Sequence, residues 1–283
     1  MVVFIDSLKS SLTNLRKNWI YLPIAAFLDV VFLLLFQLSN GIFNAKIAPF
    51  VAELVKSGGR LAQTITDAAL SGQSPVSVFL SDVDVASSVS SILMWVVALV
   101  LSLYALWTLF NGANWYLANK MNGDKHHWMT YFTKFSFISA IWVASLSLLA
   151  YFAARLILFL LLRPEAVISS AAIQSLMGVF NYVIFYFVLI SISLVPFTTT
   201  KENFKRTFKK GILQLPTYAA AFAIILGFFY VNFAVTYFIT KPFFVASETI
   251  TFSIVLINLF RVLIAAPFIT WARMYLIEVS KKV

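Results

Sequence analysis

Long uninterrupted runs of apolar residues are the feature that most limits what this chain can fold into. An α-helix needs about 20 predominantly apolar residues to cross the hydrocarbon core of a bilayer. Six stretches reach that length, at residues 19–38, 89–110, 135–162, 171–197, 216–239 and 249–271. A transmembrane barrel would instead show segments of roughly ten residues with alternating polarity. The sequence therefore predicts an all-α fold, a polytopic integral membrane bundle of six transmembrane helices forming one membrane domain.

The composition excludes most kinds of catalytic site. Of the 283 residues, 61% are hydrophobic and only 11% are charged, whereas about 25% of a soluble domain is charged. The absence of cysteine excludes disulfides, thiol catalysis and cysteine-ligated metals. The phosphate-binding, zinc-protease and serine-hydrolase motifs are also missing. Because these motifs are missing, we expect no enzymatic activity and no cofactor. His126 and His127 are adjacent and would point in different directions from a helix, so we also expect no metal site.

The basic residues predict the orientation in the membrane. With the N-terminus inside, the inner segments hold fourteen of the 21 Lys and Arg residues and the outer loops hold five. Cytoplasmic loops are the ones enriched in Lys and Arg. We therefore expect both termini to lie in the cytoplasm.

Two basic stretches have the pattern of short amphipathic helices at the membrane interface. They precede the first and fifth spans, and each ends in Leu-Pro, at Pro23 and Pro216. The second stretch holds the residues expected to contact anionic lipids, which are Lys201, Lys205, Arg206, Lys209 and Lys210. RNA is an alternative partner for such a run, but the flanking spans favour lipid, so no nucleic-acid partner is expected.

The segment between the first two spans, residues 41–88, is expected to be a long extracytoplasmic loop. Its pattern indicates an amphipathic helix broken at Gly58 and Gly59, followed by the sequence SDVDVASS, which would cap the second span. One interpretation is a lid or a docking element for a protein partner, because long ordered loops are often functional. The alternative is a helix lying on the outer leaflet.

Three charged residues fall inside predicted spans, where a charge is costly and marks a candidate site. Asp29 lies ten residues after Trp19, and Arg261 lies ten residues before Trp271, so both sit about 15 Å deep at the same level. We predict that Asp29 and Arg261 pair. Arg155 of the third span would either reach outward or bend toward Asp29.

Uncharged polar residues of the spans gather at or outside the predicted midplane. They suggest an outward-facing polar cavity, whose lining candidates are Gln37, Asn40, Tyr151, Asn181, Asn232 and Asn258. Two arginines and one aspartate at its floor would favour an anionic ligand. The alternative is that these groups only hold helices together, as membrane Asn and Gln commonly do. Asn111 and Asn114 are expected to cap a helix or form hydrogen bonds.

Two functions follow from these patterns. The first is a transporter, channel or ligand-binding membrane protein with a cavity for a small anionic ligand. The alternative is a non-enzymatic scaffold or assembly subunit that binds lipids and partner proteins through the 41–88 segment and the basic helices.

Overall fold

The fold is taken from a computed structural model of the chain. The structure describes residues 2–71, 77–78, 81–124, 126–161, 170–245 and 250–283. Within and between these ranges, the side chains of residues 2, 4, 62, 65, 68, 69, 153–174, 176, 177 and 239–263 lie outside the description.

Every regular element in the described ranges is helical. The α-helices are α1 (Val2–Lys17), α2 (Leu22–Leu70), α4 (Val83–Leu106), α5 (Gly112–Met121), α6 (Trp128–Leu161), α7 (Ser170–Leu194), α8 (Thr200–Leu213), α9 (Leu215–Val245) and α10 (Ile250–Lys282). Two short 3₁₀ turns, η1 (Trp19–Tyr21) and η3 (Val195–Phe197), precede α2 and follow α7. A π-helical turn, η2 (Trp107–Asn111), joins α4 to α5.

The predicted all-α class is confirmed, together with its membrane-like character. Five helical segments in the described ranges are long and apolar enough to cross a bilayer, beginning at Trp19, Val83, Trp128, Gly178 and Leu215. The sixth predicted span corresponds to α10, in which the side chains of residues 250–263 lie outside the description. The two basic amphipathic stretches form the separate helices α1 and α8, as expected.

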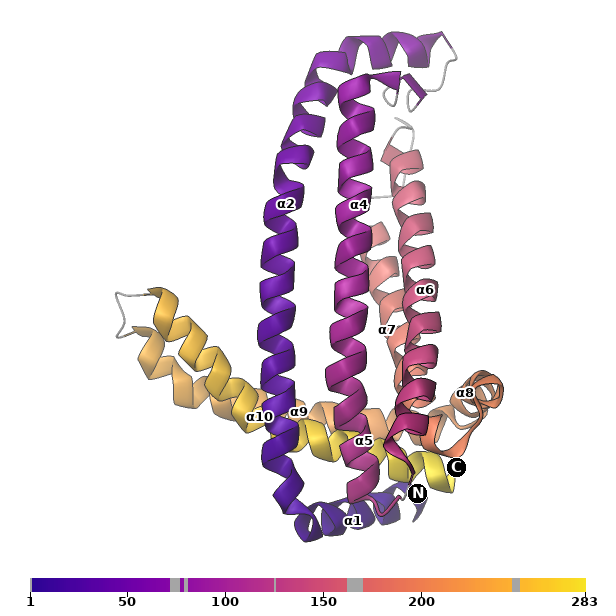
Figure 1. Cartoon of the computed structure of the whole chain (residues 1–283), viewed down its shortest axis with the longest axis vertical. Coiled ribbons are helices and arrows are strands. Elements are labelled where there is room, and N and C mark those ends of the chain that lie inside the picture. Colours follow the sequence, from indigo (N-terminus) through magenta and orange to yellow (C-terminus); the bar gives the residue numbers. More distant parts are fainter. Residues whose placement is uncertain (1, 72–76, 79–80, 125, 162–169, 246–249) are drawn as a thin grey trace.

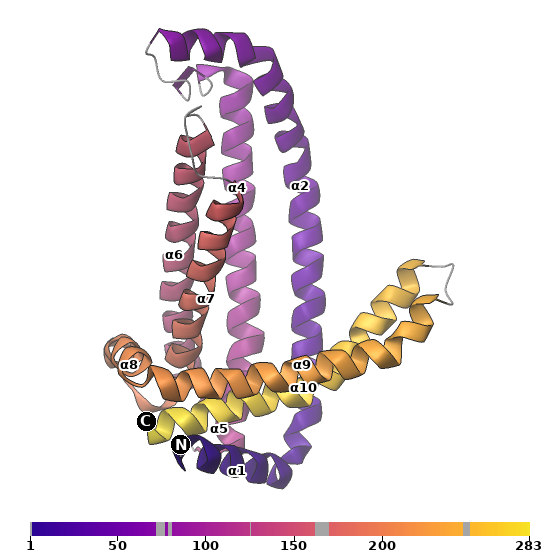
Figure 2. The same ribbon diagram turned by 180° about the vertical axis from the view of Figure 1, so that it is seen from behind.

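The long helices do not form a single set of near-parallel rods. In Figures 1 and 2, α2, α4, α6 and α7 stand side by side, while α9 and α10 form a hairpin that runs across them. Both termini lie at the end of the upright helices where this crossing occurs, together with α1, α5 and α8. We call this the basal end, and we call the opposite end, where α2 finishes and α4 starts, the distal end.

Helix α2 occupies much of the segment that the sequence predicted as a loop. It continues through Gly58 and Gly59 to Leu70, with Pro49 in its interior. Each helical glycine costs about 1 kcal/mol relative to alanine, but α2 packs against α4 over much of its length. One such contact joins the rings of Phe43 and Trp95, whose centroids lie 5.9 Å apart. Tertiary packing therefore supports a helix that local sequence signals would end.

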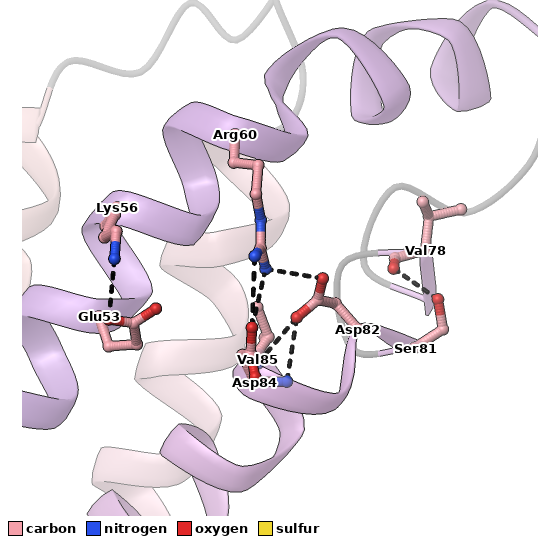
Figure 3. Close-up of polar contacts among 8 residues, drawn as sticks. All are labelled: Glu53, Lys56, Arg60, Val78, Ser81, Asp82, Asp84 and Val85. Carbon is pink, nitrogen blue, oxygen red and sulfur yellow. Dashed lines mark hydrogen bonds and ion pairs between the residues drawn. The ribbon is translucent and has the colours of Figure 1, made fainter.

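Charged residues hold the distal end together (Figure 3). Arg60 of α2 lies between two carboxylates at the start of α4, with Nη2 2.9 Å from Asp82 Oδ2 and 3.3 Å from Asp84 Oδ2. Asp82 is also the N-cap of α4, since its side chain accepts hydrogen bonds from the backbone N–H groups of Asp84 and Val85. The predicted capping role of the SDVDVASS segment is thus confirmed.

The best-buried part of the molecule lies at the basal end. Residues 270–280 of α10 are all buried, and this helix contacts α1, α2, α5, α7 and α9. Trp271 donates from Nε1 to Ser11 Oγ of α1 at 3.1 Å, and Asn122 donates to the Met274 carbonyl at 2.9 Å. The C-terminal half of α10 is therefore the central packing element of the basal end.

Candidate functional site

A buried ion pair lies where α10 crosses α2. Asp29 is 5% exposed and Arg273 is 8% exposed. The guanidinium donates from Nη1 to Oδ2 at 2.9 Å and from Nη2 to Oδ1 at 2.8 Å, which is the two-pronged geometry of strong Arg–carboxylate pairs. The pair therefore fixes how α10 is rotated about its own axis and where along α2 it crosses.

Two asparagines complete this polar cluster. Asn114 of α5 donates from Nδ2 to Asp29 Oδ1 at 2.7 Å. Asn111, the last residue of the π-turn η2, accepts from Arg273 Nη2 at 3.2 Å. The cluster of Asp29, Asn111, Asn114 and Arg273 therefore joins four elements of the basal end, and the expectation that both asparagines form hydrogen bonds is confirmed.

The partner of Asp29 differs from the one that the sequence indicated. We predicted Arg261, whereas both carboxylate oxygens bind Arg273. Arg273 lies beyond the sixth predicted span, which ended at residue 271, but α10 continues to Lys282 and brings Arg273 against α2. Arg261 lies twelve residues earlier in the same helix, about 18 Å along its axis. The side chains of Arg261, Arg155 and Asn258 lie outside the described residues.

Two adjoining cavities lie between the helices next to this cluster. Cavity 1, of about 630 Å³, is open on one side and is lined by residues of α2, α4, η2, α6 and α7. Cavity 2, of about 700 Å³, is also open on one side and is lined by residues of η2, α5, α7, α9 and α10. The two cavities adjoin, because both are lined by Trp107, Tyr182 and Phe185. Each volume is within the range of about 300–1,000 Å³ typical of ligand sites.

The lining of both cavities is dominated by apolar and aromatic side chains. Cavity 1 is lined by Phe32, Phe36, Val100, Leu103, Tyr104, Trp107, Ser139, Trp142, Val143, Leu146, Ser147, Asn181, Tyr182, Phe185, Val188 and Ile192. Cavity 2 is lined by Trp107, Asn111, Trp115, Tyr182, Phe185, Tyr186, Leu189, Leu215, Ala219, Phe222, Ala223, Ile225, Leu226, Phe229, Ile269, Ala272, Arg273 and Leu276. Among the described residues that line the two cavities, Arg273 alone is charged, and it pairs with Asp29.

The structure gathers few of the predicted lining residues around a cavity. Asn181 lines cavity 1, whereas Gln37, Asn40, Tyr151 and Asn232 line neither cavity. Gln37 and Tyr151 are exposed on the outside of their helices, and Asn40 donates to the Phe36 carbonyl of its own helix. The described polar residues are therefore not gathered around one cavity, as we had expected for an outward-facing polar cavity.

A second polar network joins α7 and α8 and contains residues that the sequence did not single out. Asn203 is fully buried. Its Nδ2 donates to the Ser191 carbonyl at 2.9 Å and to Thr198 Oγ1 at 3.1 Å, while its Oδ1 accepts from Ser191 Oγ at 2.6 Å and from Thr207 Oγ1 at 3.3 Å. This network anchors the basic helix α8 to the bundle.

The predicted lipid-contacting residues of α8 divide into two groups. Lys201, Lys205, Arg206 and Lys209 are exposed. Lys210 is half-buried and donates to the Ser280 carbonyl at 3.1 Å. Burial, with a smaller contribution from the nearby positive charge of Arg206, lowers the pKa of Lys210. Lys210 therefore belongs to the contact between α8 and α10.

Known proteins give no further guide to the site. Comparisons with family models, curated proteins and solved structures gave no match. In the described part of the chain, no group of three or more His, Asp or Glu side chains is placed to hold a metal ion.

Proposed function

We propose that the chain is an integral membrane protein that binds a lipid-like molecule in cavities 1 and 2. The observation that carries this proposal is the pair of adjoining apolar cavities between helices that are long and apolar enough to span a bilayer. Helices of this kind are surrounded by lipid tails, so a lipid-like molecule is the solute most available to such cavities. Apolar and aromatic linings with a few polar groups are typical of sites for small hydrophobic ligands.

The linings argue against the small anionic ligand that the sequence suggested. That expectation depended on two arginines facing one aspartate. In the described residues one arginine, Arg273, faces Asp29, and the two charges balance. A small anion would lose its hydration in an apolar cavity without gaining a net positive charge, and this transfer is costly.

A scaffold function is the second candidate, and one observation favours it. Helix α2 has 49 residues and is about 73 Å long when measured along its axis, which bends at the distal end (Figures 1 and 2), whereas the hydrocarbon core is about 30 Å thick. The distal end, held by Arg60, Asp82 and Asp84, would then project beyond the bilayer and be available to a partner. A pure scaffold would be insensitive to any change inside the cavities.

The orientation is also part of the proposal. Both termini lie at the basal end (Figures 1 and 2), which agrees with an even number of crossings. We propose that this basal end faces the cytoplasm, because the inner segments hold most of the basic residues.

Single cysteines test this orientation cleanly, because the chain has none of its own. Val83 at the distal end and Lys282 at the basal end are both exposed. In intact cells, a membrane-impermeant maleimide should label Val83→Cys and leave Lys282→Cys unlabelled until the membrane is permeabilised. Labelling of Lys282→Cys but not Val83→Cys in intact cells would reverse the proposed orientation.

A side chain that fills cavity 2 tests the binding function. Ala223 of α9 lines this cavity. Ala223→Trp should occupy the space and remove most of the lipid that co-purifies with the protein in detergent, as measured by mass spectrometry. The matched control is Ala105→Trp on α4, at an exposed position that lines neither cavity. Equal lipid content in both variants and the wild type would count against the cavity as a binding site and favour the scaffold.

A further inference from the structure

One polar side chain that lines cavity 2 carries a hydrogen-bond donor without a partner among the described residues. Asn111 lines this cavity and is 5% exposed. Its Oδ1 accepts from Arg273, and since a guanidinium only donates, the orientation of the amide is fixed by this contact. Its Nδ2 then has no hydrogen-bond partner among the described residues. A buried donor left unpaired is costly, which suggests that a group absent from the protein chain pairs with it.

Arg273 adds further donors at the same place. It also lines cavity 2, and its three hydrogen bonds to Asp29 and Asn111 use one Nη1 hydrogen and both Nη2 hydrogens. One Nη1 hydrogen and the Nε hydrogen have no partner in the described part of the chain. The two side chains together therefore offer donors and no free charge, because Asp29 neutralises the guanidinium.

The backbone at this point is unusual in a way that supports a binding role. Asn111 ends the π-turn η2, which interrupts the otherwise α-helical run from Val83 to Met121. Such turns are rare and occur frequently at functional sites. The same turn begins at Trp107, which lines both cavities.

We infer that cavity 2 binds a lipid whose head is an uncharged carbonyl group, such as an ester or a ketone. The carbonyl oxygen accepts hydrogen bonds from Asn111 Nδ2 and from the free N–H groups of Arg273. The alkyl chain of the lipid lies in the apolar part of the cavity. This inference rests on the proposed function and adds the chemistry of the head. A carbonyl oxygen accepts hydrogen bonds and carries no charge, so it matches a donor set whose ion pair is already balanced. An anionic head would lose its hydration beside an ion pair whose two charges already balance, and this transfer is costly.

Three photoactivatable probes test the inference on the full-length protein in detergent. All three carry the same long alkyl group with a diazirine. One ends in a methyl ester, one in a sulfonate and one has no polar head. Wild-type protein should be labelled about tenfold more strongly by the ester than by either other probe. Asn111→Leu should reduce ester labelling to the level of the headless probe and leave the headless probe unchanged.

Two further variants keep the test independent of folding. Asn111→Asp retains an oxygen for Arg273 but removes the amide hydrogens, so it should lose ester preference as Asn111→Leu does. Asn232 is the matched control, since it is buried with an unpartnered Nδ2 among the described residues and lines neither cavity. Asn232→Leu should keep the ester preference.

The outcomes separate the inference from the proposed function. If all three probes label the protein equally and Ala223→Trp abolishes this labelling, the carbonyl head is overturned and the lipid site is retained. Strongest labelling by the sulfonate would overturn it in favour of an anionic head. Labelling that Ala223→Trp leaves unchanged for every probe would overturn the proposed function as well.

Discussion

Replacing Arg273 by alanine is expected to lower the free energy of unfolding by about 3–5 kcal/mol, the cost of leaving one charge of a buried pair without its partner. The side chains of Arg273 and Asp29 are only 9% and 6% exposed, so water cannot take the place of the missing group. Asp29→Ala should cost a similar amount. Chemical denaturation in detergent micelles, followed by tryptophan fluorescence, measures both losses.

The double replacement Asp29→Leu with Arg273→Met separates charge burial from packing. Replacing both members of a buried pair by apolar residues is often neutral, so the double variant should recover most of the lost stability. The matched control is Arg206→Ala, which breaks an exposed pair with Glu202 and should cost at most about 1 kcal/mol. Equal, small losses in Arg273→Ala and Arg206→Ala would show that the pair at the crossing of α2 and α10 is not buried in the folded protein.

Asn203→Leu is expected to cost about 3 kcal/mol or more. It removes four hydrogen bonds at a fully buried position, and each group left unpaired costs about 1–3 kcal/mol. Because these bonds anchor α8, the variant should also be cut faster by trypsin after the exposed Lys205 and Lys209. The same denaturation experiment and a time course of proteolysis check the two effects.

The matched control for Asn203 is Asn44→Leu, at an exposed position on α2. This change should alter stability by no more than about 0.5 kcal/mol and leave the cleavage of α8 unchanged. If Asn203→Leu behaved like Asn44→Leu, the network between α7 and α8 would not hold α8 in place.

The class of fold could be predicted from the sequence because it depends on one-dimensional properties. The length of each apolar run and the amphipathic pattern of residues 2–17 and 200–213 are local features, and the expected helices are present there. The extent of α2 could not be predicted in the same way. Gly58, Gly59 and Pro49 are local signals that end many helices, whereas α2 continues through all three and packs against α4.

The candidate site was less predictable because it depends on how helices cross. A model of six parallel spans places Asp29 level with Arg261, whereas a hairpin of α9 and α10 that runs across α2 brings Arg273 to the same carboxylate. The π-turn at Trp107–Asn111 has no signal in the sequence that we could identify. The spacing of Asn111 and Asn114 in an apolar stretch was the one available sign, and it indicated hydrogen bonding without indicating the partner.

The most direct test of the account is to find where a bound lipid touches the protein. The headless diazirine probe is activated on the purified wild-type chain, and the modified residues are identified by peptide mass spectrometry. The account predicts modification at Trp142 of cavity 1 and Trp115 of cavity 2, which are lining residues only 8% and 3% exposed. Modification confined to outward-facing residues that line neither cavity, such as Leu93 and Phe137, would contradict it.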